Sequence, residues 1–385
     1  MSASNAASHV KMLVRSYKNL DNARQAAATN NTYNSPDTRK RLTELFRARF
    51  GGDLHDWQLD VTEAILLGLD TILIAGTGSG KTMPFMMPLL LDDKKKVLVL
   101  SPLKILQEEQ VSIHSNFRSE QALTLLQAQR FQAMGISATA VNGDTWDSGL
   151  LKVCPIFLYS DVKLTKVFQD LHDGCYRGIL TSPEMCLENV VFRDFLASTN
   201  FRDICAIVVD EAHCIVQWGE DFHTAFREIG KLRAFFPAHI PILATSATLT
   251  DSALREVRTQ LSIDMDDSFF LNLGNDCPNV LYSVLTLDSS TDFAALKTLL
   301  LPSGQDPEKP EDIKKTLVFL NKVQASQLGV REIRSWFPPH LRNCIDYLYA
   351  IRTPTSKRRA MRNFCNGSTR ILIATEAAGM VRSFP

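Results

Sequence analysis

The sequence predicts an α/β protein built from parallel sheets covered by helices, in two units of which the second is incomplete. Short apolar runs alternate with helical stretches from Asp70 onward, which favours parallel strands with helices on both faces. A glycine-rich segment lies between one such run and a helical stretch, a context typical of phosphate binding. The chain has 385 residues, enough for two ordinary domains, and is 45% hydrophobic and 22% charged, as globular proteins are.

The first elements follow from start and stop signals. Residues 1–36 form a lead-in, either helical or partly disordered. The basic character of the first fifty residues suits a weak nucleic-acid arm and, at least equally, a solvated helix face. Ser35-Pro36 and Gly51-Gly52 bracket a helix over Thr38–Phe50. Residues 37–273 are expected to form the first domain. Its expected strands are Thr71–Ile74, Val97–Leu100, Ala138–Val141, Gly178–Leu180, Ala206–Val209 and Ile242–Ala244.

The second domain is expected over residues 274–385, after a break at the segment Asn275-Asp-Cys-Pro-Asn279. Helical stretches again separate apolar β-rich runs, so we expect a second α/β unit. Its expected strands are Leu281–Leu287, Thr316–Leu320, Cys344–Tyr349 and Arg370–Ala374.

Charge and cysteine usage limit the function classes. The formal net charge is zero, so any binding to nucleic acid must come from local patches. The eight cysteines show no CxxC pair and no zinc-like spacing, which indicates free thiols in a reducing compartment. No apolar run could span a bilayer and no signal-peptide core is visible, so we expect an intracellular protein.

The segment Ala75-Gly-Thr-Gly-Ser-Gly-Lys-Thr82 predicts a triphosphate site. Its glycines permit backbone geometries that direct N–H groups at phosphates, and the helix expected over Lys81–Leu91 adds its dipole. Lys81 is expected to reach the β- and γ-phosphates, and the Thr82 hydroxyl to bind Mg²⁺. The expected phosphate cradle comprises Gly76, Thr77, Gly78, Ser79 and Gly80.

Two carboxylates follow directly after the apolar run that ends at Val209. Asp210 is expected to hold Mg²⁺, usually through a water, and Glu211 to orient or deprotonate the attacking water. Adjacent carboxylates repel each other, so a cation between them and the triphosphate is the natural compensation. We expect His213 to connect the nucleotide to Thr245-Ser-Ala-Thr248, which follows another strand.

The segment Asp210-Glu-Ala-His-Cys-Ile-Val-Gln-Trp-Gly-Glu-Asp-Phe222 resembles the DEAH box and aromatic-rich loop of the RecQ family of superfamily 2 DNA helicases. The match continues to Thr245–Thr248. The resemblance implies two RecA-like P-loop domains and ATP with Mg²⁺ as cofactors. It also implies a nuclear enzyme of recombination and repair that unwinds DNA 3′ to 5′, with single-stranded or 3′-tailed DNA as its partner.

Residue roles in base recognition come from the same resemblance. Gln58 matches the family's adenine-reading glutamine, although His55 and Leu54 replace the family's usual basic and aromatic residues. Exposed aromatic side chains stack on bases for roughly 1–3 kcal/mol each, whereas the alternative buries Trp218 and Phe222 in the core. Positions that resemble the family's DNA-contacting motifs are Lys104, Thr181, Gln217, Trp218 and Phe222.

The segment Arg370–Met380 resembles helicase motif V, and the sequence ends at Pro385 before the motif that supplies an arginine finger. Such a finger is worth on the order of 10³–10⁵ in phosphoryl-transfer rate. We therefore expect nucleotide binding, feeble hydrolysis and little unwinding. Two alternatives remain open: an RNA helicase of the same superfamily, and an ATP- and DNA-binding module without catalysis.

Overall fold

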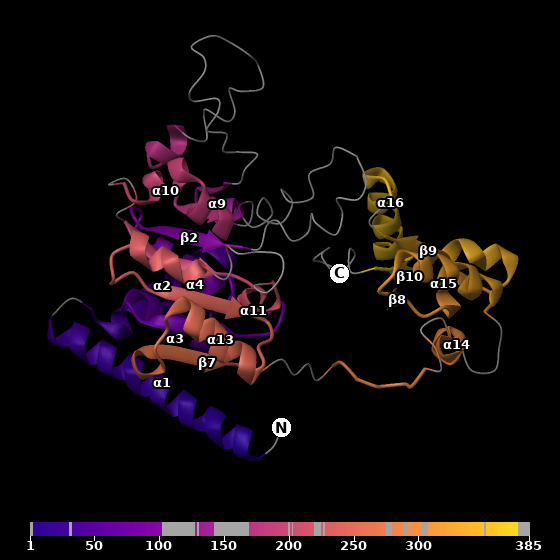
Figure 1. Cartoon of the computed structure of the whole chain (residues 1–385), viewed down its shortest axis with the longest axis horizontal. Helices are drawn as coiled ribbons and strands as arrows, with labels where there is room; N and C mark the ends of the chain where they lie inside the picture. Colours follow the sequence, from indigo (N-terminus) through magenta and orange to yellow (C-terminus); the bar gives the residue numbers. More distant parts are fainter. Residues whose placement is uncertain are drawn as a thin grey trace, which may run out of the picture. The chain divides into compact units, whose positions relative to one another are not determined.

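The computed structural model describes residues 3–30, 33–101, 128, 131–141, 169–198, 201, 203–218, 225, 228–274, 279–287, 289, 292–301, 307–349 and 352–375. The chain divides into two compact units that separate between residues 277 and 278 (Figure 1). Each unit contains a parallel sheet with helices around it, as the sequence predicts. None of the helices within the described ranges is long and apolar enough to cross a membrane.

The first unit is built on a seven-stranded sheet with the order β3-β4-β2-β5-β6-β1-β7, in which every neighbouring pair is parallel. All six predicted strands are present, and β7 is an addition that the sequence pattern did not predict. The strands are β1 Asp70–Ile74, β2 Lys96–Leu100, β3 Ala138–Ala140, β4 Gly178–Thr181, β5 Ile204–Val209, β6 Ile242–Ser246 and β7 Ser268–Asn272.

Both faces of this sheet are buried. Alternate residues of a strand point to opposite faces, so Ile72 belongs to one hydrophobic cluster and Leu73 to the other. This two-sided burial explains why the strands read as continuous apolar runs. The helices of the unit are α1 Ala3–Thr29, α2 Ser35–Phe50, α3 Asp56–Leu66, α4 Met83–Leu91, α9 Pro183–Glu188, α10 Val190–Leu196, α11 Cys214–Trp218 and α13 Asp251–Leu261.

Helix α1 corresponds to the helical alternative for the lead-in. It is one continuous helix that packs along β7, the last strand in the sheet order (Figure 1). The Phe270 amide donates a hydrogen bond to Ser16 Oγ at 2.9 Å, and Asn19 Nδ2 donates to the Ser268 carbonyl at 2.9 Å. Leu20 of the same helix is fully buried in the core. Helix α1 therefore protects an edge that would otherwise be open to another chain.

The second unit contains a three-stranded parallel sheet with the order β8-β10-β9. A hydrophobic cluster around Ile333, Ile345 and Ile373 joins this sheet to two of its helices, and a second cluster around Phe364 and Leu372 joins it to the third. The elements are β8 Thr316–Phe319, β9 Ile345–Leu348, β10 Ile371–Ala374, α14 Ala294–Leu300, α15 Val323–Ser335 and α16 Pro354–Cys365.

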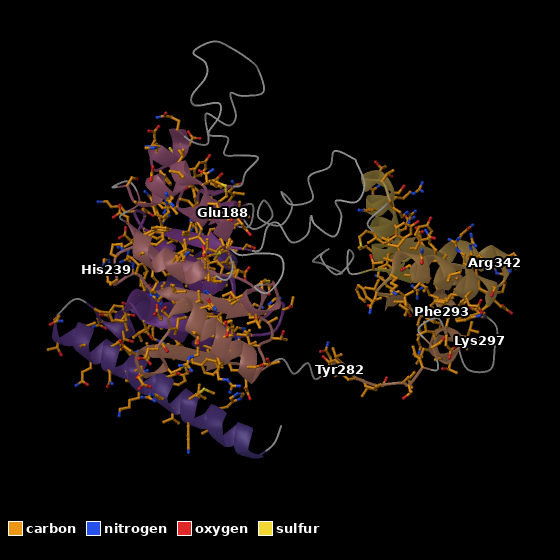
Figure 2. All side chains as sticks on the ribbon, viewed as in Figure 1. Glu188, His239, Tyr282, Phe293, Lys297 and Arg342 are labelled. Atoms are coloured by element: carbon orange, nitrogen blue, oxygen red, sulfur yellow. The ribbon has the colours of Figure 1, made fainter. Side chains whose placement is uncertain are left out.

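The strand predicted over Leu281–Leu287 is wrong. The structure has no strand or helix over residues 279–287, and the side chains there are exposed: Leu281 by 97%, Val284 by 95% and Tyr282 by 75% (Figure 2). The apolar, β-branched pattern supplies strand propensity, but a strand also needs a hydrogen-bonded neighbour. No described residue pairs with this segment in either sheet.

Candidate nucleotide site

Three segments meet at the carboxyl-terminal edge of the first sheet. The glycine loop follows β1, the acidic pair follows β5, and Thr245 and Ser246 end β6, which lies between β5 and β1. The Ala75 amide donates to the Ser246 carbonyl at 3.0 Å, and the Ala212 amide donates to the Thr245 carbonyl at 2.9 Å. Open parallel sheets place their ligands at this edge.

The glycine loop has the geometry of a phosphate cradle. Gly78 and Gly80 have φ angles of 86° and 89°, in the left-handed region that side chains disfavour. A Cβ atom at Gly76 or Gly78 would meet nothing within 4 Å, so space above the loop is open. The buried Ser79 hydroxyl has no hydrogen-bond partner among the described residues. A triphosphate oxygen would satisfy this donor, so the loop fits the predicted ligand.

Helix α4 begins at Met83 and not at Lys81 as predicted, and Lys81 and Thr82 lie in the turn before it. The Lys81 ammonium donates to the Ala75 carbonyl at 2.7 Å and to the Gly76 carbonyl at 3.2 Å. The lysine is therefore folded over the loop that it is predicted to serve. Its flexible stem allows the ammonium to turn toward a bound phosphate.

The acidic pair is held by β6. Asp210 is 8% exposed, and its Oδ1 accepts hydrogen bonds from Thr245 Oγ1 at 2.9 Å and from the Glu211 amide at 3.0 Å. Glu211 has a φ of 53°, and a left-handed conformation costs a residue with a side chain roughly 1–2 kcal/mol. His213 Nδ1 lies 3.1 Å from Ser246 Oγ and 3.4 Å from Glu211 Oε2. The histidine thus joins the acidic segment to the end of β6.

Gln58 contacts the glycine loop from α3. It is 4% exposed, its Nε2 donates to the Gly80 carbonyl at 3.3 Å, and its Oε1 accepts from the His55 amide at 2.9 Å. A Cβ atom at Gly80 would lie 2.7 Å from Gln58 Nε2. The loop needs glycine at this position because its φ of 89° is disfavoured by residues with a side chain, whereas the Gln58 amide could shift to make room.

A metal site at this edge would depend on a bound nucleotide. Within the described ranges, no group of three or more His, Cys, Asp or Glu residues could hold a metal ion. Mg²⁺ needs no such group, because it commonly binds through one or two carboxylates, substrate phosphates and retained waters. Asp210, Thr82 and a triphosphate would supply that ligand set.

The predicted nucleic-acid contacts remain predictions. Thr181 ends β4 and is fully buried, so only a shift of the chain would expose its hydroxyl. Gln217 and Trp218 fall on α11, but their side chains lie outside the described residues. Lys104 and Phe222 also lie outside them.

A family model described as DEAD/DEAH box helicase matches residues 55–257, more than half of the chain. The chain therefore belongs to the DEAD/DEAH box helicases. The ATP-dependent DNA helicase RecQ of Haemophilus influenzae is 29% identical over 227 residues, covering 59% of this chain and 30% of that protein. The RecQ-like DNA helicase BLM of Xenopus laevis is 27% identical over 256 residues, covering 66% of this chain and 16% of that protein. These relatives confirm the resemblance to the RecQ type.

Solved structures agree on the fold. The DUF1998 helicase MrfA, solved with DNA and AMPPNP, has a TM-score of 0.56 at 16% identity, covering 90% of this chain and 45% of that one. The Saccharomyces cerevisiae protein Dbp5, solved with RNA and ADP BeF3, has a TM-score of 0.54 at 14% identity, covering 87% and 73%. The two RecQ-type relatives above are much longer than the segment matched, since this chain spans 30% and 16% of their lengths.

Proposed function

We propose that this chain is an ATP-dependent DNA helicase of the RecQ type that couples ATP hydrolysis to strand separation. The observation that carries this proposal is the meeting of the glycine loop and the Asp210–Glu211 pair at one sheet edge. Both segments are hydrogen-bonded to the end of β6, through Ser246 and Thr245. A triphosphate at this edge would lie between a lysine and two carboxylates, as phosphoryl transfer requires.

Each residue has a distinct role in the proposed hydrolysis. Lys81 would exchange the carbonyls of the loop for the β- and γ-phosphates. Thr82 and Asp210 would hold Mg²⁺, which would supply positive charge against the phosphates. Glu211 directs the attacking water, and its carboxylate accepts the proton. His213 would couple the acidic segment to the end of β6 through its contacts with Glu211 and Ser246.

The choice of DNA as partner is supported by the relatives, whose names describe DNA helicases. We propose that Lys104, Thr181 and the Gln217–Phe222 segment contact single-stranded DNA, with Trp218 and Phe222 stacking on bases. We further propose, with the RecQ resemblance as support, that the chain unwinds DNA from a 3′ tail, acts in recombination and repair, and is located in the nucleus.

Substitution of Lys81 tests the nucleotide site. Lys81→Ala removes two charge-assisted contacts, which are worth about 1.5–3 kcal/mol each, so ATP affinity is expected to fall by about 10²–10⁴-fold. The measurement is a titration of the full chain with ATP and Mg²⁺. Lys231→Ala is the matched control, because Lys231 is exposed and pairs only locally with Glu228. Equal affinity in the Lys81 variant and the wild type would refute the site.

DNA stimulation tests the partner. We expect single-stranded DNA to raise ATP turnover more than single-stranded RNA of the same sequence, and a 3′-tailed duplex to be unwound in preference to a 5′-tailed one. Greater stimulation by RNA would favour an RNA helicase instead. Nucleotide binding without DNA-stimulated turnover would favour a binding module without catalysis.

A further inference from the structure

A buried ion cluster lies where α1, α2 and α3 meet, and the sequence analysis did not single it out. Asp60 and Glu63 of α3 are 8% and 0% exposed. Arg39 Nη1 of α2 lies 2.7 Å from Asp60 Oδ1 and 2.6 Å from Glu63 Oε2. Arg24 Nη2 of α1 pairs with Glu63 Oε2 and lies 3.4 Å from Asp60 Oδ1. We call Arg24, Arg39, Asp60 and Glu63 the arginine–carboxylate cluster.

Hydroxyl groups add hydrogen bonds to the two carboxylates of the cluster. Tyr17 donates to Asp60 Oδ2 at 2.9 Å, Tyr33 donates to Glu63 Oε1 at 2.9 Å, and Ser35 donates to the same Glu63 oxygen. The two carboxylates thus face two guanidinium groups and three hydroxyls. Buried carboxylates need such pairing, because removal of one partner leaves an uncompensated charge in the interior. Arg24 Nε is itself buried without a hydrogen-bond partner among the described residues.

The direction of the Glu63 pKa shift shows that the cluster stabilises the ionised form of this carboxyl. Burial raises the pKa of this carboxyl, but the hydrogen bonds from Arg24, Ser35 and Arg39 outweigh that effect and hold the pKa below its ordinary value. Burial and the hydrogen bond to Asp60 raise the pKa of Tyr17 to about 12. Glu63 is therefore ionised and Tyr17 is neutral at physiological pH.

The opposite face of α3 contacts the nucleotide site. At 100° per residue, Gln58 lies about 160° around the helix from Asp60 and about 140° from Glu63. Gln58 Nε2 donates to the Gly80 carbonyl, and Thr62 Oγ1 bonds to the Gln58 carbonyl at 2.6 Å and to the Pro84 carbonyl at 3.4 Å. Helix α3 is therefore fixed on one side by the arginines and on the other by the glycine loop and α4.

We propose that the arginine–carboxylate cluster positions Gln58 against the glycine loop and thereby sets the affinity of the site for ATP. Arg24 and Arg39 act as positioning residues, through α3, rather than by contact with the nucleotide. The inference rests on the proposed ATP site. It makes α1 a working part of that site, although α1 lies outside the matched family segment, which begins at residue 55.

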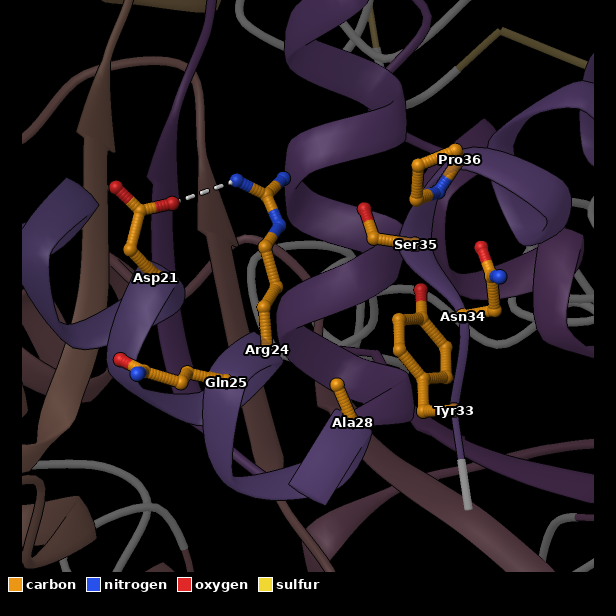
Figure 3. A pocket seen from close by; sticks show the side chains of 8 residues that line it. All are labelled: Asp21, Arg24, Gln25, Ala28, Tyr33, Asn34, Ser35 and Pro36. Atoms are coloured by element: carbon orange, nitrogen blue, oxygen red, sulfur yellow. Dashed lines mark hydrogen bonds and ion pairs between the residues drawn. The ribbon is translucent and has the colours of Figure 1, made fainter. Parts of the chain in front are cut away.

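Arg24 is the residue best suited to a test. It lines a cavity of about 690 Å³ together with Asp21, Tyr33 and Ser35, and its Nη1 lies 3.0 Å from Asp21 Oδ1 (Figure 3). Water can enter this cavity and fill the space that a shorter side chain would leave. Arg24→Lys therefore keeps the positive charge but loses the guanidinium fork that spans Asp21 and Glu63. A matched control is Arg233→Lys, because Arg233 is similarly exposed, 26% against 23%, and pairs with Asp70 at the start of β1.

The experiment is ATP titration of the full chain, with thermal unfolding of each variant. Arg24→Lys is expected to weaken ATP binding by about fivefold to tenfold, the worth of one misplaced hydrogen bond, and to reduce the preference for ATP over GTP. Arg233→Lys should lower the Tm comparably and leave ATP affinity within about twofold of wild type. In a Gln58→Ala background, Arg24→Lys should produce no further loss, because the two residues act through one contact.

Three outcomes would overturn the inference: unchanged affinity in Arg24→Lys, an equal loss in Arg233→Lys, or additive losses with Gln58→Ala. Failure of the underlying ATP site gives a different pattern. A wild-type chain that binds no ATP overturns the proposed function together with this inference. Wild-type binding that Lys81→Ala abolishes and Arg24→Lys leaves intact overturns this inference alone.

Discussion

The first sheet places a lysine, two carboxylates and a histidine near the carboxyl ends of its strands, whereas the second sheet places aromatic groups there. In the second unit, Phe319 ends β8 and is 50% exposed, and the rings of Tyr347 and Tyr349 stack 4.9 Å apart at the end of β9. Arg352 lies over the Tyr347 ring at 4.3 Å. Two sheets of one architecture thus carry different chemistry, because the residues that follow the strands decide what a sheet can bind.

The edges of the two sheets differ as well. In the first unit, Ser16 and Asn19 of α1 bond to the backbone of the outer strand β7. In the second unit, the outer strand β8 is only partly buried along its length. The first unit thus carries the candidate nucleotide site, and α1 covers its outer strand, whereas β8 is only partly buried.

The sharpest test of the chemical contrast is Glu211→Gln. The amide keeps the shape of the side chain but cannot accept the proton from water, so the ATPase rate is expected to fall by about 10²–10⁴-fold while ATP affinity is retained. Steady-state turnover and equilibrium titration together measure this split. Glu228→Gln serves as the control, because that glutamate is half exposed and pairs with Lys231, one turn further along the short helix that it precedes. A fully active Glu211 variant would remove the catalytic distinction between the sheets.

The contribution of α1 to the stability of the first unit can be tested by substituting two leucines, one buried and one exposed. Leu20→Ala in α1 removes a fully buried side chain and should destabilise the first unit by about 2–5 kcal/mol, measured by urea unfolding. Leu281→Ala alters a leucine that is 97% exposed, so its effect should stay within about 0.5 kcal/mol. Similar effects of the two substitutions would show that α1 does not stabilise the unit.

The smallest expected effect concerns pH. Because the pKa of Glu63 is lower in the folded chain than in the unfolded one, its contribution to stability is fully present above the unfolded value of about 4.3. That contribution is lost as the pH falls below 4.3 and through the lower folded value. Urea unfolding between pH 3 and 7 should show a steeper acid loss in the wild type than in Glu63→Gln. Parallel curves would mean that Glu63 is not stabilised by its partners.

Local sequence signals predicted much of this structure. Contiguous segments such as Gly76–Thr82 and Asp210–His213 could be placed at strand ends, because each follows an apolar run that forms a strand. Ser268–Asn272 was missed because its apolar run is bounded by polar residues and follows an acidic turn at residues 265–267. Leu281–Leu287 was wrong because pattern alone does not supply a pairing partner.

The arginine–carboxylate cluster could not be predicted from the sequence, because its members come from separate helices. Arg24 and Glu63 lie 39 residues apart and on separate helices, so nothing in their local sequence indicates that they meet. In the sequence, Arg24 counted only as one of several basic residues near the start of the chain. Ion pairs between elements depend on tertiary packing, which periodicity and motif spacing do not report.

The packing of α1 on β7 has a consequence for how the chain acquires its structure. Ser16 and Phe270 are 254 residues apart, so a ribosome exposes the first helix long before its docking strand exists. Until then α1 lacks the strand β7 on which it packs, and its apolar side chains, such as Leu20, are exposed to aggregation with other chains. Contacts of such long range slow folding, because a large loop must close before they form. Synthesis past β7 is therefore the moment at which this unit can first be completed.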